Sequence, residues 1–154
     1  MLMFIVMSGF NLAYASSATV VKVYSGDTLD VETQSEIVKI KLYGIDAPES
    51  GQDGNLSATR FLERLVLQSP IDIKVMETDV FGRNLAIIGH EGQKWSLNAI
   101  MVANGYAWVK PDECKIDLCS DLNKLESQAR TLKLGIWSGF DLVPPWEFMK
   151  HQRN

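Results

Sequence analysis

Positive charge is scarce in this sequence. Its 154 residues include 15 lysines and arginines against 19 aspartates and glutamates, which gives a formal net charge of -4. A protein that coats nucleic acid through a broad basic face has the opposite balance. If the chain acts on a phosphate group, the positive charge must therefore be local, from a bound metal ion or from a few well-placed cations.

Glycine and proline are also few, with 11 and 5 residues, which excludes a collagen-like repeat or a low-complexity segment. Hydrophobic residues make up 46% of the chain and charged residues 22%. These values are typical of globular proteins and argue against disorder and against a polytopic membrane protein. The length is that of one domain, and the sequence contains no repeat and no interdomain linker.

The N-terminal segment, residues 2–15 (LMFIVMSGFNLAYA), is apolar but shorter than the roughly 20 residues of a membrane-spanning helix. It ends in Ala13-Tyr14-Ala15, a small-x-small pattern that signal peptidases accept, although no lysine or arginine precedes it. The pattern favours a secretory signal in residues 1–15 and a folded domain in residues 16–154. The protein would then be exported, to the periplasm or to the medium. An uncleaved membrane anchor and a buried N-terminal helix are the alternatives.

Cysteine occurs only at Cys114 and Cys119, and histidine only at His90 and His151. In an exported chain, two neighbouring cysteines usually form a disulfide. Half of a zinc site is the alternative, but neither histidine lies at a ligand spacing from the cysteines. We therefore expect a disulfide that pins one surface loop.

Short segments of alternating or β-branched residues predict five strands, over residues 19–23, 28–33, 37–45, 71–76 and 85–89. Apolar residues at helical spacing predict helices over residues 56–68, 95–104 and 122–134. The tail from Ile136 is aromatic and proline-rich. Because parallel βαβ repetition is missing, this order favours an α+β fold, an OB-fold-like five-stranded barrel capped by three helices.

Three carboxylates lie where predicted strands end, at Asp27, Asp46 and Glu49. Hard divalent ions such as Ca²⁺ and Mg²⁺ take oxygen ligands from carboxylates and carbonyls, and the turn after Asp46 could present the Ala47 carbonyl. Arg83 adds a cation at a further turn, and its guanidinium can bind phosphate in a bidentate fork. Taken singly, each aspartate is more often a turn former, and a turn arginine is usually a solvated surface residue.

Taken together and in order, these motifs resemble the staphylococcal nuclease family. The residues that carry the resemblance are Val21-x(4)-Gly26-Asp27-Thr28, Lys41-Leu42-x(2)-Ile45-Asp46-Ala47-Pro48-Glu49, Asp79-x-Phe81-Gly82-Arg83, Asn98-x(6)-Gly105-x-Ala107-Trp108, Leu125-Glu126-x(2)-Ala129-Arg130-x(4)-Gly135-Ile136-Trp137 and Pro145-Trp146-Glu147-Phe148. The resemblance covers essentially everything after the N-terminal segment.

The resemblance implies Ca²⁺-dependent hydrolysis of DNA and RNA phosphodiesters by a five-stranded barrel with three helices. It implies that Asp27, Asp46 and the backbone carbonyl of Ala47 bind the Ca²⁺ ion or another divalent ion. Glu49 would orient or deprotonate the attacking water, and Arg83 would stabilise the transition-state phosphate and the departing oxygen. Nucleic acid would be the substrate of a monomer, with no stable protein partner implied.

The chain departs from the family pattern at Lys41, where the family typically has a second phosphate-binding arginine. The charge survives but the planar fork does not. Lys41 could therefore be a phosphate-binding catalytic residue, or a mark of a catalytically weakened module that only binds nucleic acid. It could also lie with Lys39 on the solvent face of a strand. A structural or partner-binding domain is a third possible function.

A binding module for single strands would place exposed aromatic side chains among its basic residues. No such run is found in the sequence. We expect the large aromatic residues to lie in the core or at its edge instead. These residues are Phe81, Trp95, Trp108, Trp137 and Trp146.

Overall fold

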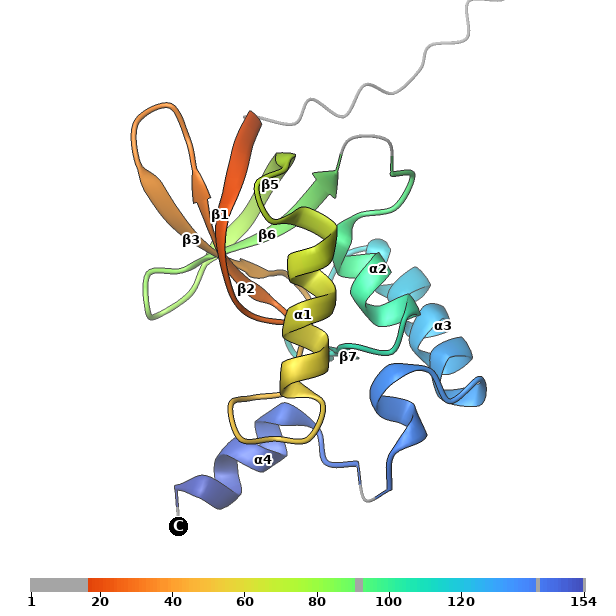
Figure 1. Ribbon diagram of the computed structural model, residues 1–154. Coiled ribbons are helices and arrows are strands. Elements are labelled where there is room, and N and C mark those ends of the chain that lie inside the picture. Colours follow the sequence, from red (N-terminus) through yellow and green to blue (C-terminus); the bar gives the residue numbers. More distant parts are fainter. Residues whose placement is uncertain (1–16, 91–92, 141, 154) are drawn as a thin grey trace, which may run out of the picture.

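Figure 1 shows the computed structural model of the protein, which describes residues 17–90, 93–140 and 142–153. The expected signal segment, residues 1–15, lies outside the described residues, and its role stays a prediction. Within the described residues, no helix combines the length and the apolar character that crossing a membrane requires.

The strand pattern predicted a five-stranded barrel, and this barrel is present. Its strands follow one another in the order β1-β2-β3-β6-β5. They are β1 (Ser17–Ser25), β2 (Thr28–Glu32), β3 (Ile37–Leu42), β5 (Pro70–Thr78) and β6 (Asn84–His90). The first three form an antiparallel meander, and the barrel closes where β3 pairs with β6 in parallel. Inward-facing apolar side chains fill the barrel, among them Val20, Leu29, Val31, Ile40 and Ile88, each at most 1% exposed.

The expected third strand, residues 37–45, is divided in two. β3 ends at Leu42, and the chain turns at Gly44, whose φ of 74° is in the left-handed region that favours glycine. A two-residue strand, β4 (Ile45–Asp46), then pairs with β7 (Trp108–Val109) outside the barrel. This turn brings the residues after Leu42 back beside the end of β3.

The predicted disulfide between Cys114 and Cys119 is present, with Cα atoms 5.5 Å apart. A Cβ atom added to Gly44 would lie 2.6 Å from the Sγ of Cys114. The disulfide loop therefore packs closely against the turn between β3 and β4.

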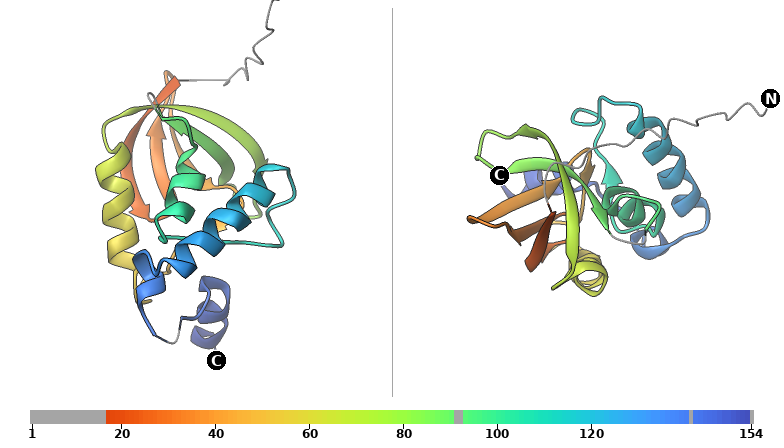
Figure 2. Two further views of the ribbon diagram at one scale, coloured as in Figure 1. Left: turned by 90° about the vertical axis from the view of Figure 1, so that its right-hand side faces the viewer. Right: turned by 90° about the horizontal axis from the view of Figure 1, so that it is seen from above.

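The three predicted helices are present, with shifted ends, as α1 (Asn55–Val66), α2 (Leu97–Ala103) and α3 (Leu118–Thr131). A short 3₁₀ helix, η1 (Gly135–Ser138), and a fourth α-helix, α4 (Pro145–Gln152), follow in the aromatic and proline-rich tail, for which no helix was predicted. Proline at the first helical position does not interrupt a helix, because the N–H that it lacks has no partner there. Figure 2 shows α4 below the barrel and α3.

Two glycines form a close backbone crossing between the segments that follow α2 and α3. Gly105 and Gly135 both have positive φ, 74° and 54°, and a Cβ atom on either would collide with the backbone of the other segment. The crossing positions η1, where Trp137 packs edge-to-face on Trp108 with ring centroids 5.0 Å apart. Trp146 of α4 packs against this aromatic cluster.

Candidate active site

Asp27 lies in the turn between β1 and β2, and its side chain is buried. Its Oδ1 accepts hydrogen bonds from the hydroxyls of Ser25 and Thr28, at 2.7 and 2.9 Å. Its Oδ2 accepts one from the Ala47 backbone N–H at 2.9 Å and one from the Lys41 ammonium at 2.6 Å. Asp27 therefore joins the first turn of the barrel to the end of β3 and to the loop after β4.

Lys41 lies between two carboxylates. Its Nζ is 2.6 Å from Oδ2 of Asp27 and 2.9 Å from Oδ1 of Asp46, and only 8% of its side chain is exposed. The alternative that places Lys41 on a solvent face is therefore wrong. Lys39 lines the same cleft as Lys41 but is more exposed, and it pairs with Asp30 at 3.3 Å.

The three charges shift one another's pKa values. Burial alone would raise the pKa of Asp27, but the charge and hydrogen bond of Lys41 bring it down to about 2. Burial raises the pKa of Asp46 to about 6; Lys41 opposes this increase and the charge of Asp27 adds to it. Burial disfavours the ammonium of Lys41, yet the two carboxylates raise its pKa above the usual value. At neutral pH one ammonium thus faces two carboxylates, which leaves one net negative charge.

Glu49 follows β4 in the turn that contains Pro48. The backbone N–H of Glu49 donates to Oε1 of Gln52 at 2.9 Å, and Nδ2 of Asn55 donates to the Pro48 carbonyl at 2.7 Å. The side chain is half-buried, and burial, followed by the negative charge of Asp27, raises the pKa of its carboxyl. These contacts fix the backbone that carries a carboxylate with increased proton affinity.

Arg83 lies at the end of the turn between β5 and β6. Oδ1 of Asp79 accepts the backbone N–H groups of Phe81 and Arg83, both at 2.9 Å, and its Oδ2 accepts Nε of Arg83 at 2.7 Å. Asp79 therefore shapes the turn and also orients the guanidinium.

One buried amide supports this arrangement. Nδ2 of Asn98, on α2, donates to the carbonyls of Tyr43 and Ala86 at 2.9 and 3.1 Å, and its Oδ1 accepts the N–H of Ile88 at 3.1 Å. Asn98 thus joins α2, β6 and the turn between β3 and β4. The sequence pattern included Asn98, but its positioning role needed the coordinates.

A cleft of about 690 Å³ brings four of the predicted site residues together: Lys41, Asp46, Glu49 and Arg83. Asp27 is not part of the cleft wall and lies behind Lys41, to which it is bonded. Ala47 is buried, and its N–H faces Asp27. The role predicted for its carbonyl stays a prediction.

Sequence reasoning missed further cations of the cleft wall. Lys110, after β7, lies in this wall, as do Lys150 and Arg153 at the end of α4. The spacing of three residues between Lys150 and Arg153 places both on one helical face, but this signal is only meaningful once the tail is assigned as a helix.

Two of the aromatic residues expected in the core are exposed. Phe81, which lines the cleft, is 79% exposed, and Trp95 is 48% exposed. Trp108 and Trp137 are buried as expected, whereas Trp146 is half-buried and contacts both the aromatic cluster and the cleft. The cleft therefore has exposed aromatic surface beside its charges.

Among the described residues, no three Asp, Glu, His or Cys side chains gather closely enough to hold a metal ion. Two carboxylates, those of Asp27 and Asp46, do converge on one positive group, the ammonium of Lys41. Carboxylate oxygens are the ligands that hard divalent ions prefer, and the net negative charge attracts a cation. The donor set therefore fits such an ion, with Lys41 holding the position between the two carboxylates.

Comparisons with known proteins point to one family. Residues 39–139 match the family described as staphylococcal nuclease homologue. A micrococcal nuclease of Shigella flexneri is 31% identical over 147 residues, which cover 88% of this chain and 81% of the relative. An uncharacterized endonuclease of Escherichia coli O157:H7 is 35% identical over 127 residues, covering 82% and 80%. Staphylococcal-like nuclease CAN1 of Arabidopsis thaliana is 29% identical over 123 residues, covering 80% of this chain and 36% of the plant protein.

The family match covers the chain from within β3 to η1, whereas β1 and β2 precede it. It includes four of the predicted site residues that line the cleft, Lys41, Asp46, Glu49 and Arg83, and it begins after Asp27. The structure accounts for the matched pattern, since its acidic and basic residues meet in a single cleft. The chain belongs to the staphylococcal nuclease family and is a nuclease that hydrolyses phosphodiester bonds.

Proposed function

We propose that the protein is an exported, Ca²⁺-dependent endonuclease that cleaves DNA, RNA or both by attack of water on the phosphorus. The observation that carries the proposal is the convergence of Asp27 and Asp46 on one cationic position, with Glu49 and Arg83 in the adjoining cleft. The family is generally metal-dependent, and this donor set accords with a hard divalent ion.

Asp27, Asp46 and the Ala47 carbonyl would hold the ion. When bound, a divalent ion neutralises charge on the phosphate and helps to organise the attacking water. The same two carboxylates cannot keep all their contacts with Lys41 while they bind the ion. Metal binding is therefore expected to compete with the Lys41 ammonium, which makes that side chain available to the phosphate in the cleft.

Glu49 would accept the proton of the attacking water. Its raised pKa makes its carboxylate a stronger base than an exposed glutamate. Because the contacts of Gln52 and Asn55 hold its loop, little reorganisation is needed before proton transfer.

Arg83 would bind the phosphate and stabilise the negative charge that spreads over its oxygens in the transition state. The ion pair with Asp79 holds the guanidinium by its Nε side, so its terminal nitrogens can donate to an anion. A cation that is oriented before the reaction stabilises this charge without reorganisation at the moment of attack.

The test is cleavage of plasmid, single-stranded DNA and RNA by the purified protein, with Ca²⁺ and then with a chelator. We expect cleavage that depends on the added ion. We also expect it to occur at internal phosphodiester bonds, as an endonuclease cleaves them. Absence of cleavage with Ca²⁺ and with other divalent ions, at micromolar enzyme over hours, would contradict the proposal.

A weakened module that binds nucleic acid without cutting it is the second candidate. The observation that favours it is the engagement of Lys41 with both presumed ligands, since a lysine also lacks the bidentate fork of an arginine. Binding with a steep salt dependence and no cleavage would support it. A large rate gain in Lys41→Arg would show that Lys41 is a poor substitute within an active site.

Export rests on the apolar segment at residues 2–15 and accords with the Cys114–Cys119 disulfide, because disulfides persist in oxidising compartments. Fractionation of cells that produce the full chain should place the protein in the periplasm or the medium, without the first 15 residues. Retention of the segment on membrane-bound protein would indicate the anchor instead.

A further inference from the structure

We propose that α4 forms a subsite that binds a nucleic-acid strand as it runs on from the scissile phosphate, in single-stranded form. The subsite consists of Trp146, Lys150 and Arg153. It rests on the proposed function, because its ligand is the substrate of the same cleft. The family match ends at residue 139, and so α4 lies beyond it.

The first support is position. Trp146, Lys150 and Arg153 share the wall of one cleft with Lys41, Glu49 and Arg83. In Figure 1, α4 lies below the barrel, and its residues share the cleft wall with Asp79, Phe81 and Arg83 of the turn between β5 and β6. A strand whose phosphate lies at Arg83 and Glu49 therefore continues past α4.

The second support is that α4 is anchored. Trp146 packs on the aromatic cluster around Trp108 and Trp137. The amide of Gln52 also joins two segments: its Oε1 accepts the N–H of Glu49 at 2.9 Å, and its Nε2 donates to the Val143 carbonyl at 2.6 Å. One side chain thus bonds both the loop of the proposed general base and the segment that leads into α4. These contacts hold α4 in place as one wall of the cleft.

The third support is charge. Six cationic side chains and four carboxylates of the described residues line the cleft. Three carboxylates outside its wall also pair with cations of the wall: Asp27, Asp30 and Glu147. Lys150 is 67% exposed and pairs only with Glu147, at 2.7 Å, and none of the ion pairs of the described residues involves Arg153. Both cations can therefore take phosphate oxygens, and α4 supplies a third of the positive charge of the cleft.

The single-stranded form follows from the size and the chemistry of the cleft. A volume of about 690 Å³ is that of a small-molecule pocket, enough for about one or two nucleotides. The half-buried ring of Trp146 offers an aromatic surface to an unpaired base, and such stacking contributes about 1–3 kcal/mol per base. Bases in a duplex are paired and stacked on each other, so they gain nothing from this surface.

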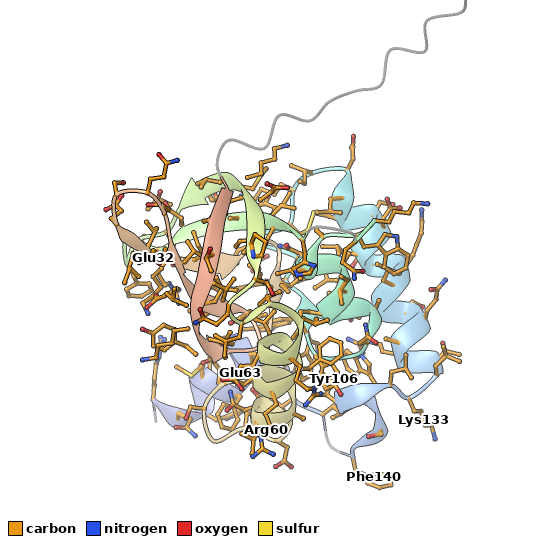
Figure 3. The ribbon with its side chains drawn as sticks, turned by 45° about the horizontal axis from the view of Figure 1, so that its top comes forward. Glu32, Arg60, Glu63, Tyr106, Lys133 and Phe140 are labelled. Atoms are coloured by element: carbon orange, nitrogen blue, oxygen red, sulfur yellow. A yellow bond between two sulfur atoms is a disulfide. The ribbon has the colours of Figure 1, made fainter. Side chains whose placement is uncertain are left out.

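The test compares two double variants that lose the same charge. Lys150→Gln with Arg153→Gln removes both cations of the subsite. Lys124→Gln with Lys133→Gln is the control, because Lys124 pairs with Asp121 three residues before it, at 3.2 Å, as Lys150 pairs with Glu147. Lys133 is exposed just after α3 (Figure 3). Neither control residue lines the cleft.

Binding is measured first, with chelator present so that no substrate is cut. Anisotropy of a labelled oligo-dT strand over a series of salt concentrations gives the affinity and its salt dependence. We expect the α4 variant to bind roughly tenfold more weakly, with the slope of log K against log salt reduced by about 0.7 for each lost phosphate contact. The control should keep the wild-type slope, and both variants should keep the wild-type Tm.

Cleavage with the metal ion is measured second. The α4 variant should show a raised KM for a long single strand and an unchanged kcat. Equal losses in both double variants, or unchanged binding in the α4 variant, would overturn the subsite. If the α4 variant loses as much affinity for a duplex as for a single strand, the proposal that the subsite takes the single-stranded form is overturned.

The two proposals can fail separately. If the wild-type protein does not cut but the α4 variant alone loses single-strand binding, the proposed nuclease reaction fails and the subsite stands. If the wild type cuts and the α4 variant behaves like the control in both measurements, the reaction stands and the subsite fails.

Discussion

The ammonium of Lys41 lies 2.6 Å from the carboxylate of Asp27, and the side chains of both residues are at least nine-tenths buried. Asp46 completes the cluster on the other side of the same nitrogen. Burying three charged groups is expensive unless each has its counterion. In the protein without metal, Lys41 is that counterion.

Replacing Lys41 with methionine should therefore destabilise the metal-free protein by about 3–5 kcal/mol, because two buried carboxylates lose their partner. Urea unfolding with chelator present measures this loss. Lys41→Arg keeps the charge and is the control. Added Ca²⁺ should stabilise Lys41→Met more than wild type, since the ion becomes the only cation shared by the two carboxylates. Equal stabilisation of the two proteins would contradict competition between Lys41 and the ion.

The raised pKa of Asp46 predicts that metal-free protein becomes less stable as pH rises. A carboxyl whose pKa is about 6 in the folded protein, against 3.8 as the reference value, binds more protons folded than unfolded between these values. The free energy of unfolding should therefore decrease by about 2 kcal/mol between pH 4.5 and pH 7. Glu49, with its raised pKa, acts in the same direction.

Asp46→Asn tests this dependence by urea unfolding at several pH values with chelator. The groups that act on Asp46 are Lys41, Asp27 and Lys110, and none of them is changed. The variant should show a markedly flatter profile in this window. Below about pH 4 the lowered pKa of Asp27 reverses the trend, since stability is lost as that carboxylate is protonated. An unchanged profile in Asp46→Asn would show that another group titrates.

Glu49→Gln should lower kcat by roughly 10²–10⁴, the usual contribution of general base catalysis, and leave Tm near the wild-type value. Initial rates on a single-stranded substrate with saturating Ca²⁺ measure the effect. Glu113→Gln is the matched control, because Glu113 lines the same cleft but pairs with Lys110 at 2.6 Å. Similar losses in the two variants would assign the effect to the charge of the cleft rather than to proton transfer.

Arg83→Ala should lower kcat by roughly 10²–10³, since it removes an oriented donor to the transition state. Asp79→Ala should give a smaller loss in the same direction, because the guanidinium remains but loses its bond through Nε. Asp121→Ala, which breaks the exposed pair with Lys124, is the control. Full activity in Asp79→Ala would show that the ion pair does not position Arg83.

Asn98→Ala should destabilise the fold by about 3 kcal/mol, because the carbonyls of Tyr43 and Ala86 and the N–H of Ile88 lose a buried partner. Thermal or urea unfolding measures the loss. Asn104→Ala is the control, since Asn104 is exposed and makes one side-chain bond, to the Ile100 carbonyl. A loss no greater than that of the control would mean that other groups hold the turn between β3 and β4.

Much of the barrel could be predicted because alternation along a strand reports which side chains face inward. Leu29 and Val31 on β2 show this pattern, and both are fully buried. Alternation says nothing about which strands become neighbours. The convergence of Asp27 and Asp46 depends on how β3 pairs with β6 and on the turn at Gly44. The sequence prediction that these two residues share a site therefore depended on the family resemblance.

Three features of the site could not be predicted from the sequence, each for a physical reason. The bridging position of Lys41 depends on distances that a strand pattern does not contain. Helix α4 was missed because the pair Pro144-Pro145 is typical of a turn or loop, although Pro145 at the first helical position is compatible with a helix. Phe81 was expected in the core from its hydrophobicity, which predicts burial only on average.

The close approach of Gly105 and Gly135 has a consequence for amino-acid substitutions at these two positions. Each glycine admits the other segment only because neither has a side chain. A methyl group at either position would push η1 outward, and with it Trp137, the surface on which the base of α4 rests. Gly105 lies three residues before Trp108, which packs on Trp137 and pairs with Asp46 between β7 and β4. The displacement would therefore reach the residues around Asp46 as well as the helix that we assign to the outgoing strand. A side chain at this crossing would thus disturb two parts of the site that are far apart in the sequence, the strand that carries Asp46 and the helix α4.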